Sequence, residues 1–303
     1  MVGRILVSGA SGVLGSALVP SLKAGGVQIA RLTRGNAVPQ ASGADERIPW
    51  NPAEPLPPQA VSGFDAVIHL AGEGIVGRWT AAKKAHIRDS RVQGTLHVAQ
   101  ALAHAEQKPR VFVCASAIGF YGNRGDEPLR EESPPGTGFL AQLCQEWENA
   151  TRPASEAGIR TAQIRIGIAL SPSGGALAKM LTPFKMGVGG IIGSGRQWMS
   201  WIDVLDLVGA IQHILKNDSL RGPVNLVAPK PVTNAEFTKT LARALSRPAI
   251  FPMPAFAVRL AFGEMGNEVL LGSQRVEPAK LANSGYVFRF PDLRTSLQRI
   301  LGK

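Results

Sequence analysis

Three glycines at regular spacing form the first candidate site of this sequence. Gly9, Gly12 and Gly15 follow the apolar run 5–7 and open a stretch, 13–23, with helical spacing of apolar residues. The first glycine permits a tight turn, the second lets the main chain approach a pyrophosphate, and the third allows close helix packing. The helix N-terminus then offers free N–H groups to an anion. The pattern predicts a dinucleotide loop that also uses Ser11, Val13 and Leu14; the alternative is a glycine-rich turn without a ligand.

The end of the second predicted strand, 27–33, suggests which dinucleotide. A site for NAD usually has a carboxylate here for the ribose 2′-hydroxyl. This strand instead ends in Thr33 and Arg34, and no carboxylate follows before Asp45. A hydroxyl and a guanidinium suit a 2′-phosphate. We therefore expect NADP rather than NAD, unless Arg34 merely faces water.

Elements that could position this site alternate along the first half of the chain. Short buried strands are predicted at 4–8, 27–33, 65–70, 110–115 and 160–167, and helices at 13–23, 80–104 and 138–157. Such alternation is typical of a parallel sheet covered on both faces. We predict an α/β fold with a doubly wound, Rossmann-like parallel sheet.

The composition of the sequence and its pattern of predicted elements change after about residue 170. A glycine-rich stretch, 171–195, is followed by a predicted helix at 204–215, a strand at 224–228, and a helix whose capping box is Thr233 with Glu236. We expect a dinucleotide-binding domain at 1–170 and a smaller α/β region on the substrate side at 171–303. Residues 248–303 form a distinct last segment, and 204–228 could join the sheet.

Composition limits the remaining function classes. The 303 residues are 45% hydrophobic and 18% charged, with a formal net charge of +11. No apolar run approaches the ~18 residues of a membrane span, and the first strand leads directly into the glycine loop, unlike a secretory signal. Cys114 and Cys144 fit reduced core residues. We expect a cytoplasmic monomer or homodimer with a small-molecule substrate and no membrane partner, and with a solvated basic surface rather than a nucleic-acid site.

Several motifs together resemble one family. They are Ser8-Gly9-Ala10-Ser11-Gly12-Val13-Leu14-Gly15, His69-Leu70-Ala71-Gly72-Glu73, Ser90-Arg91-Val92-Gln93-Gly94-Thr95, Ser116-Ala117-Ile118-Gly119-Phe120-Tyr121-Gly122, Gly193-Ser194-Gly195-Arg196-Gln197-Trp198 and Asn225-Leu226-Val227-Ala228-Pro229. With the last fifty or so residues, they make the chain similar to an extended short-chain dehydrogenase/reductase of the nucleotide-sugar epimerase type. The nearest resemblance is to the atypical epimerase-family subgroup, whose C-terminal segment is a domain of unknown function.

The resemblance implies where a cofactor would lie. Leu70, Ala71 and Gly72 would pass over the adenine–ribose region, with small side chains so that the main chain can lie against the ligand. Arg91 would sit near the same edge and add a cation for the 2′-phosphate, or else form a surface salt bridge. The strand end at 165–167 would lie near the nicotinamide.

The sequence departs from the family at the usual catalytic helix. The resemblance implies a Ser, a Tyr and, four residues after the Tyr, a Lys that lowers its pKa. Ser116 fits, but the Tyr and Lys positions hold Phe139 and Leu143. The arginine that would contact a substrate diphosphate is replaced by Met199. The usual proton relay is therefore absent, and a nucleotide-sugar substrate is in doubt.

Other side chains could act in its place. Tyr121 follows the strand that bears Ser116, and Glu73 follows the strand 65–70. We name Ser116, Tyr121 and Glu73 as catalytic candidates, although Tyr121 could equally be a packed aromatic whose hydroxyl caps a loop. Cys144 suits a core position better than a nucleophile. Asp203 and Asp206 suit a helix start, and we predict no metal site.

Three hypotheses of function follow. The first is an NADP-dependent epimerase or oxidoreductase acting on an unidentified small carbonyl, hydroxyl or sugar-like compound. The second, favoured by the missing Tyr–Lys pair, is a non-catalytic NADP(H)-sensing regulator. The third is nucleic-acid binding, suggested by the net charge of +11 but opposed by an aromatic content of only 6%.

Overall fold

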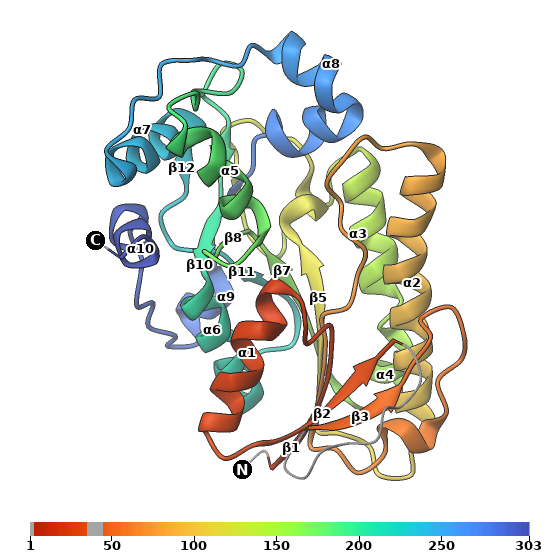
Figure 1. The fold of residues 1–303 in the computed structure, drawn as a ribbon. Coiled ribbons are helices and arrows are strands. Elements are labelled where there is room, and N and C mark those ends of the chain that lie inside the picture. Colours follow the sequence, from red (N-terminus) through yellow and green to blue (C-terminus); the bar gives the residue numbers. More distant parts are fainter. Residues whose placement is uncertain (1–2, 35–44, 303) are drawn as a thin grey trace.

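A seven-stranded parallel sheet forms the centre of the protein (Figure 1). The computed structural model describes residues 3–34 and 45–302. The sheet contains β1 (Arg4–Ser8), β2 (Gln28–Thr33), β3 (Glu46–Pro49), β4 (Ala66–His69), β5 (Val111–Ala117), β7 (Arg160–Ile166) and β11 (Gly222–Leu226), in the order β11-β7-β5-β4-β1-β2-β3. All six pairings are parallel. The prediction of a doubly wound parallel sheet is confirmed.

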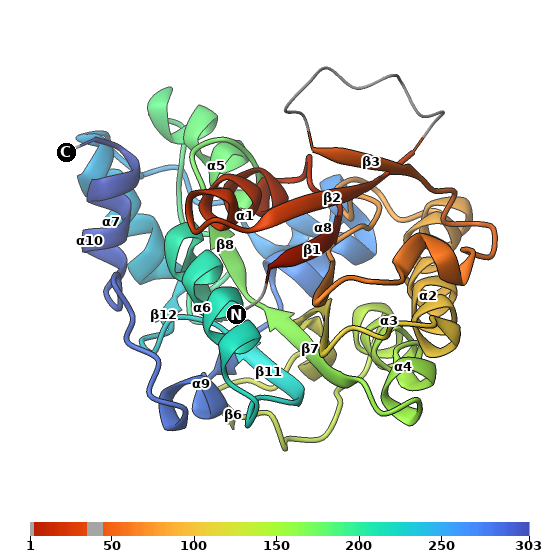
Figure 2. The same cartoon turned by 90° about the horizontal axis from the view of Figure 1, so that it is seen from below.

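Helices cover both faces of this sheet. On one face lie α1 (Val13–Ala24) and α6 (Val204–Lys216), which share a hydrophobic core with the strands. On the other lie α2 (Ala81–His104), α3 (Phe139–Asn149) and α4 (Arg152–Glu156). Figure 2 shows these two groups on opposite sides of the strands. Because both faces are covered, the central strands are largely apolar; β4 is buried at every position.

The second half of the chain adds a smaller layer beside the sheet. It contains α5 (Gly175–Lys185), α7 (Asn234–Leu245) and α10 (Leu293–Ile300), packed around Trp201 and Phe237. Three two-stranded pairs connect it: β8 (Ile168–Leu170) with β10 (Trp201–Asp203), β9 (Trp198–Met199) with β12 (Val232–Thr233), and β6 (Pro128–Leu129) with β13 (Arg275–Val276). The remaining helical segments are α8 (Ala255–Met265), α9 (Ala279–Asn283), η1 (Pro58–Val61), η2 (Ile118–Tyr121) and η3 (Gly266–Leu270).

Local sequence signals explain where several helices begin and end. Thr80 caps α2 by accepting from the amide of Lys83, and the predicted capping box of Thr233 and Glu236 opens α7. The prediction of a single helix at 138–157 is wrong. This stretch is divided into α3 and α4 because Pro153 lacks an amide hydrogen and suits the first turn of a new helix.

Parallel pairing brings every strand's carboxyl end to the same edge. The loops after β1, β2, β4, β5 and β7 therefore place Gly9, Arg34, Leu70, Ile118 and Gly167 along that edge. Open α/β sheets bind ligands there. Within residues 3–34 and 45–302, no helix has the length and apolar composition needed to cross a membrane.

Candidate functional site

The glycine loop brings three main-chain segments into close contact. Gly9 has a φ of +69°, and a Cβ there would lie 2.6 Å from the carbonyl carbon of Leu70. A Cβ on Gly15 would lie 2.3 Å from the carbonyl oxygen of Gly9. The amide of Gly12 donates to that same oxygen over 3.0 Å. Only glycine fits at positions 9 and 15, so the turn and the start of α1 keep the geometry that their spacing predicts.

The N-terminus of α1 is left open to a ligand. Its N-cap is Gly12, which supplies no side-chain hydrogen bond, and its first turn contains no acidic residue. Within the described chain, no protein group accepts the amides of Val13 and Leu14, while Ser11 and Gly12 are exposed. Unsatisfied amides and the positive end of a helix dipole suit a pyrophosphate. The residues present therefore fit a dinucleotide.

Arg34 lies beside a hollow at the carboxyl ends of β2 and β3. This hollow has a volume of ≈ 580 Å³. Its lining is Arg34, Pro49, Trp50, Asn51, Pro52, Glu54, Pro55, Leu56 and Pro57. Arg34 is exposed and forms no salt bridge with any described residue, and Thr33 is half-buried beside it. A free guanidinium at the edge of such a hollow can meet a phosphate.

Ser8 and His69 fix the loop that carries Leu70, Ala71 and Gly72. The hydroxyl of Ser8 accepts from the amides of Leu70 and Ala71 over 3.2 and 3.3 Å. The same oxygen lies 2.7 Å from Nδ1 of His69. Since Ser8 already accepts twice, its proton goes to Nδ1, and the neutral ring carries its own proton on Nε2. Complete burial lowers the pKa of His69 to about 4.

Arg91 lies beside Gly72, which belongs to the loop that follows β4. A Cβ on Gly72 would come within 3.1 Å of the Arg91 guanidinium carbon, which also lies 5.0 Å from the Trp147 ring centroid. Burial lowers the pKa of Arg91. Arg34 follows β2, whereas Gly72 follows β4, on the other side of β1. Both loops reach the same edge of the sheet, and Glu73 interacts electrostatically with both arginines. That Arg91 assists Arg34 at a 2′-phosphate stays a prediction.

Ser116 belongs to a buried polar network. Its hydroxyl donates to Glu148 over 2.7 Å, and Arg165 donates two hydrogen bonds of 2.8 Å to the same carboxylate. Arg165 also donates to the hydroxyl of Tyr121 over 2.9 Å, and Tyr121 donates to Asn225 over 2.7 Å. With its proton held by Glu148, Ser116 offers lone pairs, not a proton, to a ligand.

Tyr121 and Glu73 are not placed as free proton donors. Tyr121 is fully buried, and this burial raises its pKa to about 12. Its hydroxyl is used within the network, which favours the packed-aromatic alternative. Glu73 is half-buried and pairs with Lys83 over 2.8 Å; this hydrogen bond lowers the pKa of Glu73. Glu73 is therefore ionised at neutral pH.

The expected Tyr and Lys positions lie in an apolar cluster. Phe139 meets Trp79 edge to face with ring centroids 5.0 Å apart, and Leu143 is 3% exposed. The carboxylate of Glu268 accepts from the amides of Phe139 and Leu140 over 2.8 and 2.9 Å. Glu268, in the last segment of the chain, thus caps the N-terminus of α3, although it is far from α3 in the sequence. The sequence pattern did not reveal this contact.

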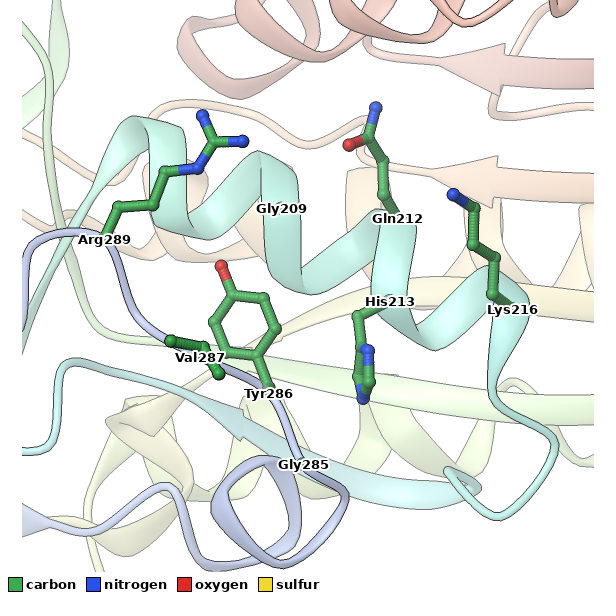
Figure 3. A pocket seen from close by; sticks show the side chains of 8 residues that line it. All are labelled: Gly209, Gln212, His213, Lys216, Gly285, Tyr286, Val287 and Arg289. Carbon is green, nitrogen blue, oxygen red and sulfur yellow. The ribbon is translucent and has the colours of Figure 1, made fainter.

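Another hollow lies away from the carboxyl edge of the sheet. It has a volume of ≈ 280 Å³ and is formed by the later turns of α6 and residues 285–289 (Figure 3). The Tyr286 hydroxyl donates to the Asp206 carbonyl over 2.9 Å, and Asp206 accepts from the amides of Arg289 and Phe290. Asp203 caps α6 and pairs with Arg299. Both aspartates lie at the start of α6, as their spacing suggested, and both also hold the C-terminal segment in place.

Comparison with known proteins identifies the family. The model of the NAD dependent epimerase/dehydratase family matches residues 5–227. The chain belongs to this family. Residues 253–300 match DUF1731, a domain of unknown function. Epimerase family protein Mb2239 of Mycobacterium bovis is 43% identical over 286 residues, covering 94% of this chain and 93% of the relative.

Two solved structures extend the comparison. Human epimerase family protein SDR39U1 (isoform 2) with NADPH superposes with a TM-score of 0.89 at 34% identity, over 99% of each chain. A nucleoside-diphosphate sugar epimerase from Corynebacterium glutamicum gives a TM-score of 0.82 at 37% identity, over all of this chain and 59% of the other. The resemblance to the atypical epimerase-family subgroup is confirmed.

In this epimerase-family protein, sequence patterns did not reveal several site residues. The sequence around Glu148 and Arg165 did not show that they join Ser116 in one network. Nor did the sequence around His69 show that it pairs with Ser8. The only available signal was a polar residue within an otherwise buried strand, as at Arg165 in 160–166. Cys114 and Cys144 are free and buried, and burial raises the pKa of each to about 12. Among the residues described, no group of three potential ligands could hold a metal ion.

Proposed function

We propose that this epimerase-family protein binds NADP(H) at the carboxyl edge of its sheet. Gly9, Gly12 and the first turn of α1 would hold the pyrophosphate, and Arg34 with Thr33 the 2′-phosphate. The observation that carries the proposal is the open N-terminus of α1, whose amides have no acceptor among the described residues. The NADPH in the human relative's structure supports the same cofactor. When bound, this cofactor supplies or accepts a hydride.

We further propose that the protein senses whether its bound cofactor is oxidised or reduced. It would not catalyse a reaction that depends on proton transfer from α3. Proton transfer needs a titratable group within reach of the reacting atoms. Phe139 and Leu143 provide none, Tyr121 is buried, and the proton of Ser116 is held by Glu148. These contacts favour the hypothesis of a redox-sensing regulator over that of an ordinary dehydrogenase.

A titration of the purified protein tests the cofactor proposal. The quenching of tryptophan fluorescence by NADPH, NADP, NADH and NAD should give dissociation constants at least about tenfold lower for the 2′-phosphorylated pair, as one charge-assisted contact implies. Equal affinities would remove the role of Arg34. No binding of any of the four would refute the proposal as a whole.

A second candidate is hydride exchange with a small carbonyl, hydroxyl or sugar-like compound. The observation in its favour is the half-buried apolar surface of Phe139, Leu140 and Phe262, which could contact such a compound. The discriminating measurement is NADPH absorbance in the presence of a library of aldehydes, ketones and sugars. Sustained oxidation that exceeds the enzyme concentration with any one of them would establish turnover and overturn the sensing proposal.

The cellular setting remains part of the proposal. Two free, buried cysteines are consistent with a reducing, cytoplasmic compartment. We retain the prediction of a monomer or homodimer without a nucleic-acid partner. Light scattering of the purified protein checks the oligomeric state, and the salt dependence of RNA retention checks the absence of RNA binding.

A further inference from the structure

One end of the molecule presents an unusual concentration of exposed apolar side chains. Eleven large hydrophobic residues are exposed in the described chain. Seven of these lie on two segments, 175–195 and 246–263, and we call their joint surface the apolar end: Met186, Val188, Ile250, Phe251, Met253, Phe256 and Leu260. It lies opposite the N-terminus, around α8 and the connection that leads to it (Figure 1).

The two segments form one continuous surface. The amide of Phe251 donates to Gly189, that of Met253 to Ile191, and that of Gly193 back to Met253. A Cβ on Gly190 would lie 1.9 Å from the Phe251 carbonyl oxygen, so the two main chains are in direct contact. On α8, Phe256 and Leu260 are one helical turn apart and 71% and 76% exposed.

The charges of this end all have the same sign. Segments 175–195 and 246–263 contain Lys179, Lys185, Arg247 and Arg259, and no Asp or Glu. The next carboxylate along the chain, Glu264, is paired with Lys84 over 2.7 Å. The apolar end therefore has a rim of cations without neighbouring acids on either segment. A surface of this kind is complementary to an anionic, apolar partner.

We propose that the apolar end binds the surface of a membrane containing anionic lipids. Exposed Phe, Leu and Met side chains would enter the boundary between headgroups and acyl chains, while the lysines and arginines meet the headgroups. A second copy of the chain is a poorer occupant, because a symmetric contact would place the same cations opposite each other. An acidic protein would need a recess for each protruding side chain, whereas fluid lipid adapts to them.

This inference revises an expectation from the sequence. Composition gave no reason to expect a membrane partner, because neither segment is long or continuously apolar. Folding creates the surface by pairing 187–193 with 248–253 and by directing the Phe256–Leu260 face of α8 outward. The proposed contact is peripheral, at the surface of the bilayer, and does not depend on the cofactor proposal.

Vesicle flotation of the full chain tests the proposal. We expect the protein to float with vesicles of phosphatidylcholine containing phosphatidylglycerol, and to float weakly with phosphatidylcholine alone. The double variant Phe256→Ser/Leu260→Ser should lower the partition coefficient at least about tenfold, since it removes two inserted side chains. Arg259→Glu should lower it roughly fivefold or more, in a manner that high salt masks.

Val287→Ser is the matched control, because Val287 is 82% exposed but lies outside the apolar end; it should float as the unmodified chain does. Retained binding of NADPH, or an unchanged circular dichroism spectrum, shows that each variant is folded. The proposal is overturned if the unmodified protein ignores anionic vesicles or if the double variant floats equally well. It is also overturned if the double variant only converts a dimer into a monomer, or only abolishes binding to an acidic protein.

Discussion

The hydroxyl of Ser116 on β5 donates to the carboxylate of Glu148 on α3 over 2.7 Å, and the same carboxylate receives both arms of Arg165 from β7. This contact joins a helix to two neighbouring strands. It also decides what Ser116 can offer to a ligand, since a serine whose proton is already donated can only accept. The region next to the cofactor edge is thus organised by a buried ion pair.

Removal of the charge from Glu148 should be costly. In Glu148→Gln the guanidinium of Arg165, whose side chain is 3% exposed, loses its only carboxylate partner in the described chain. We expect the free energy of unfolding to fall by about 3 kcal/mol or more, as for other buried pairs that lose one member. Urea denaturation measures this change.

The matched control for that prediction is Glu156→Gln. Glu156 also pairs with an arginine, Arg152, but the two side chains are 62% and 71% exposed. Its loss should change the free energy of unfolding by less than about 0.5 kcal/mol. Equal effects of the two substitutions would show that burial does not strengthen the Arg165–Glu148 contact.

Arg34 should set the preference between the two nicotinamide dinucleotides. In Arg34→Ala we expect the dissociation constant for NADPH to rise about 10- to 100-fold, because a charge-assisted contact is lost. The constant for NADH should stay within about twofold. Arg47→Ala, which removes another exposed cation from the neighbouring strand β3, should leave both constants unchanged. Equal losses for NADPH and NADH in Arg34→Ala would place Arg34 elsewhere on the ligand.

A single methyl group should disrupt the glycine loop. In Gly15→Ala the new Cβ would meet main-chain atoms of Gly9 and Ala10 at 2.3 and 2.6 Å, so α1 must shift. We expect a loss of about 1–3 kcal/mol in the free energy of unfolding and at least tenfold weaker dinucleotide binding. Gly74→Ala is the control, since nothing lies within 4 Å of its Cβ. Unchanged binding in Gly15→Ala would refute the assigned role of the loop.

Stability should depend on pH through His69. Its pKa is about 4 in the folded protein, against the ordinary histidine value of 6.5 that applies to the unfolded chain. Between these values the unfolded chain binds more protons, so stability falls as the pH drops from about 6.5 to about 4. The full contribution is about 3 kcal/mol.

Urea denaturation at a series of pH values measures this dependence. His69→Asn, whose amide can replace Nδ1 beside Ser8, should be less stable at neutral pH but should have a flatter profile between pH 4 and 6.5. If the slope is the same in the unmodified chain and in His69→Asn, then His69 is not the group responsible.

The sequence by itself determined the features that depend on neighbouring residues. Gly9 and Gly15 specify their turn because the positive φ of Gly9 and the close approach of a Gly15 Cβ to Gly9 involve residues close together in the sequence. Alternating buried strands and helices specify the parallel sheet, and Thr233 with Glu236 specifies the start of α7. These are local constraints on the main chain, and their spacing records them directly.

Only the tertiary structure decided which distant side chains meet. It placed Glu148 and Arg165 beside Ser116, and it buried Tyr121, a candidate acid, in the core. It also brought segments 187–193 and 248–253 together to form the apolar end. Such contacts depend on strand order, register and helix packing, which join residues far apart in the chain and leave no periodic signal in the sequence.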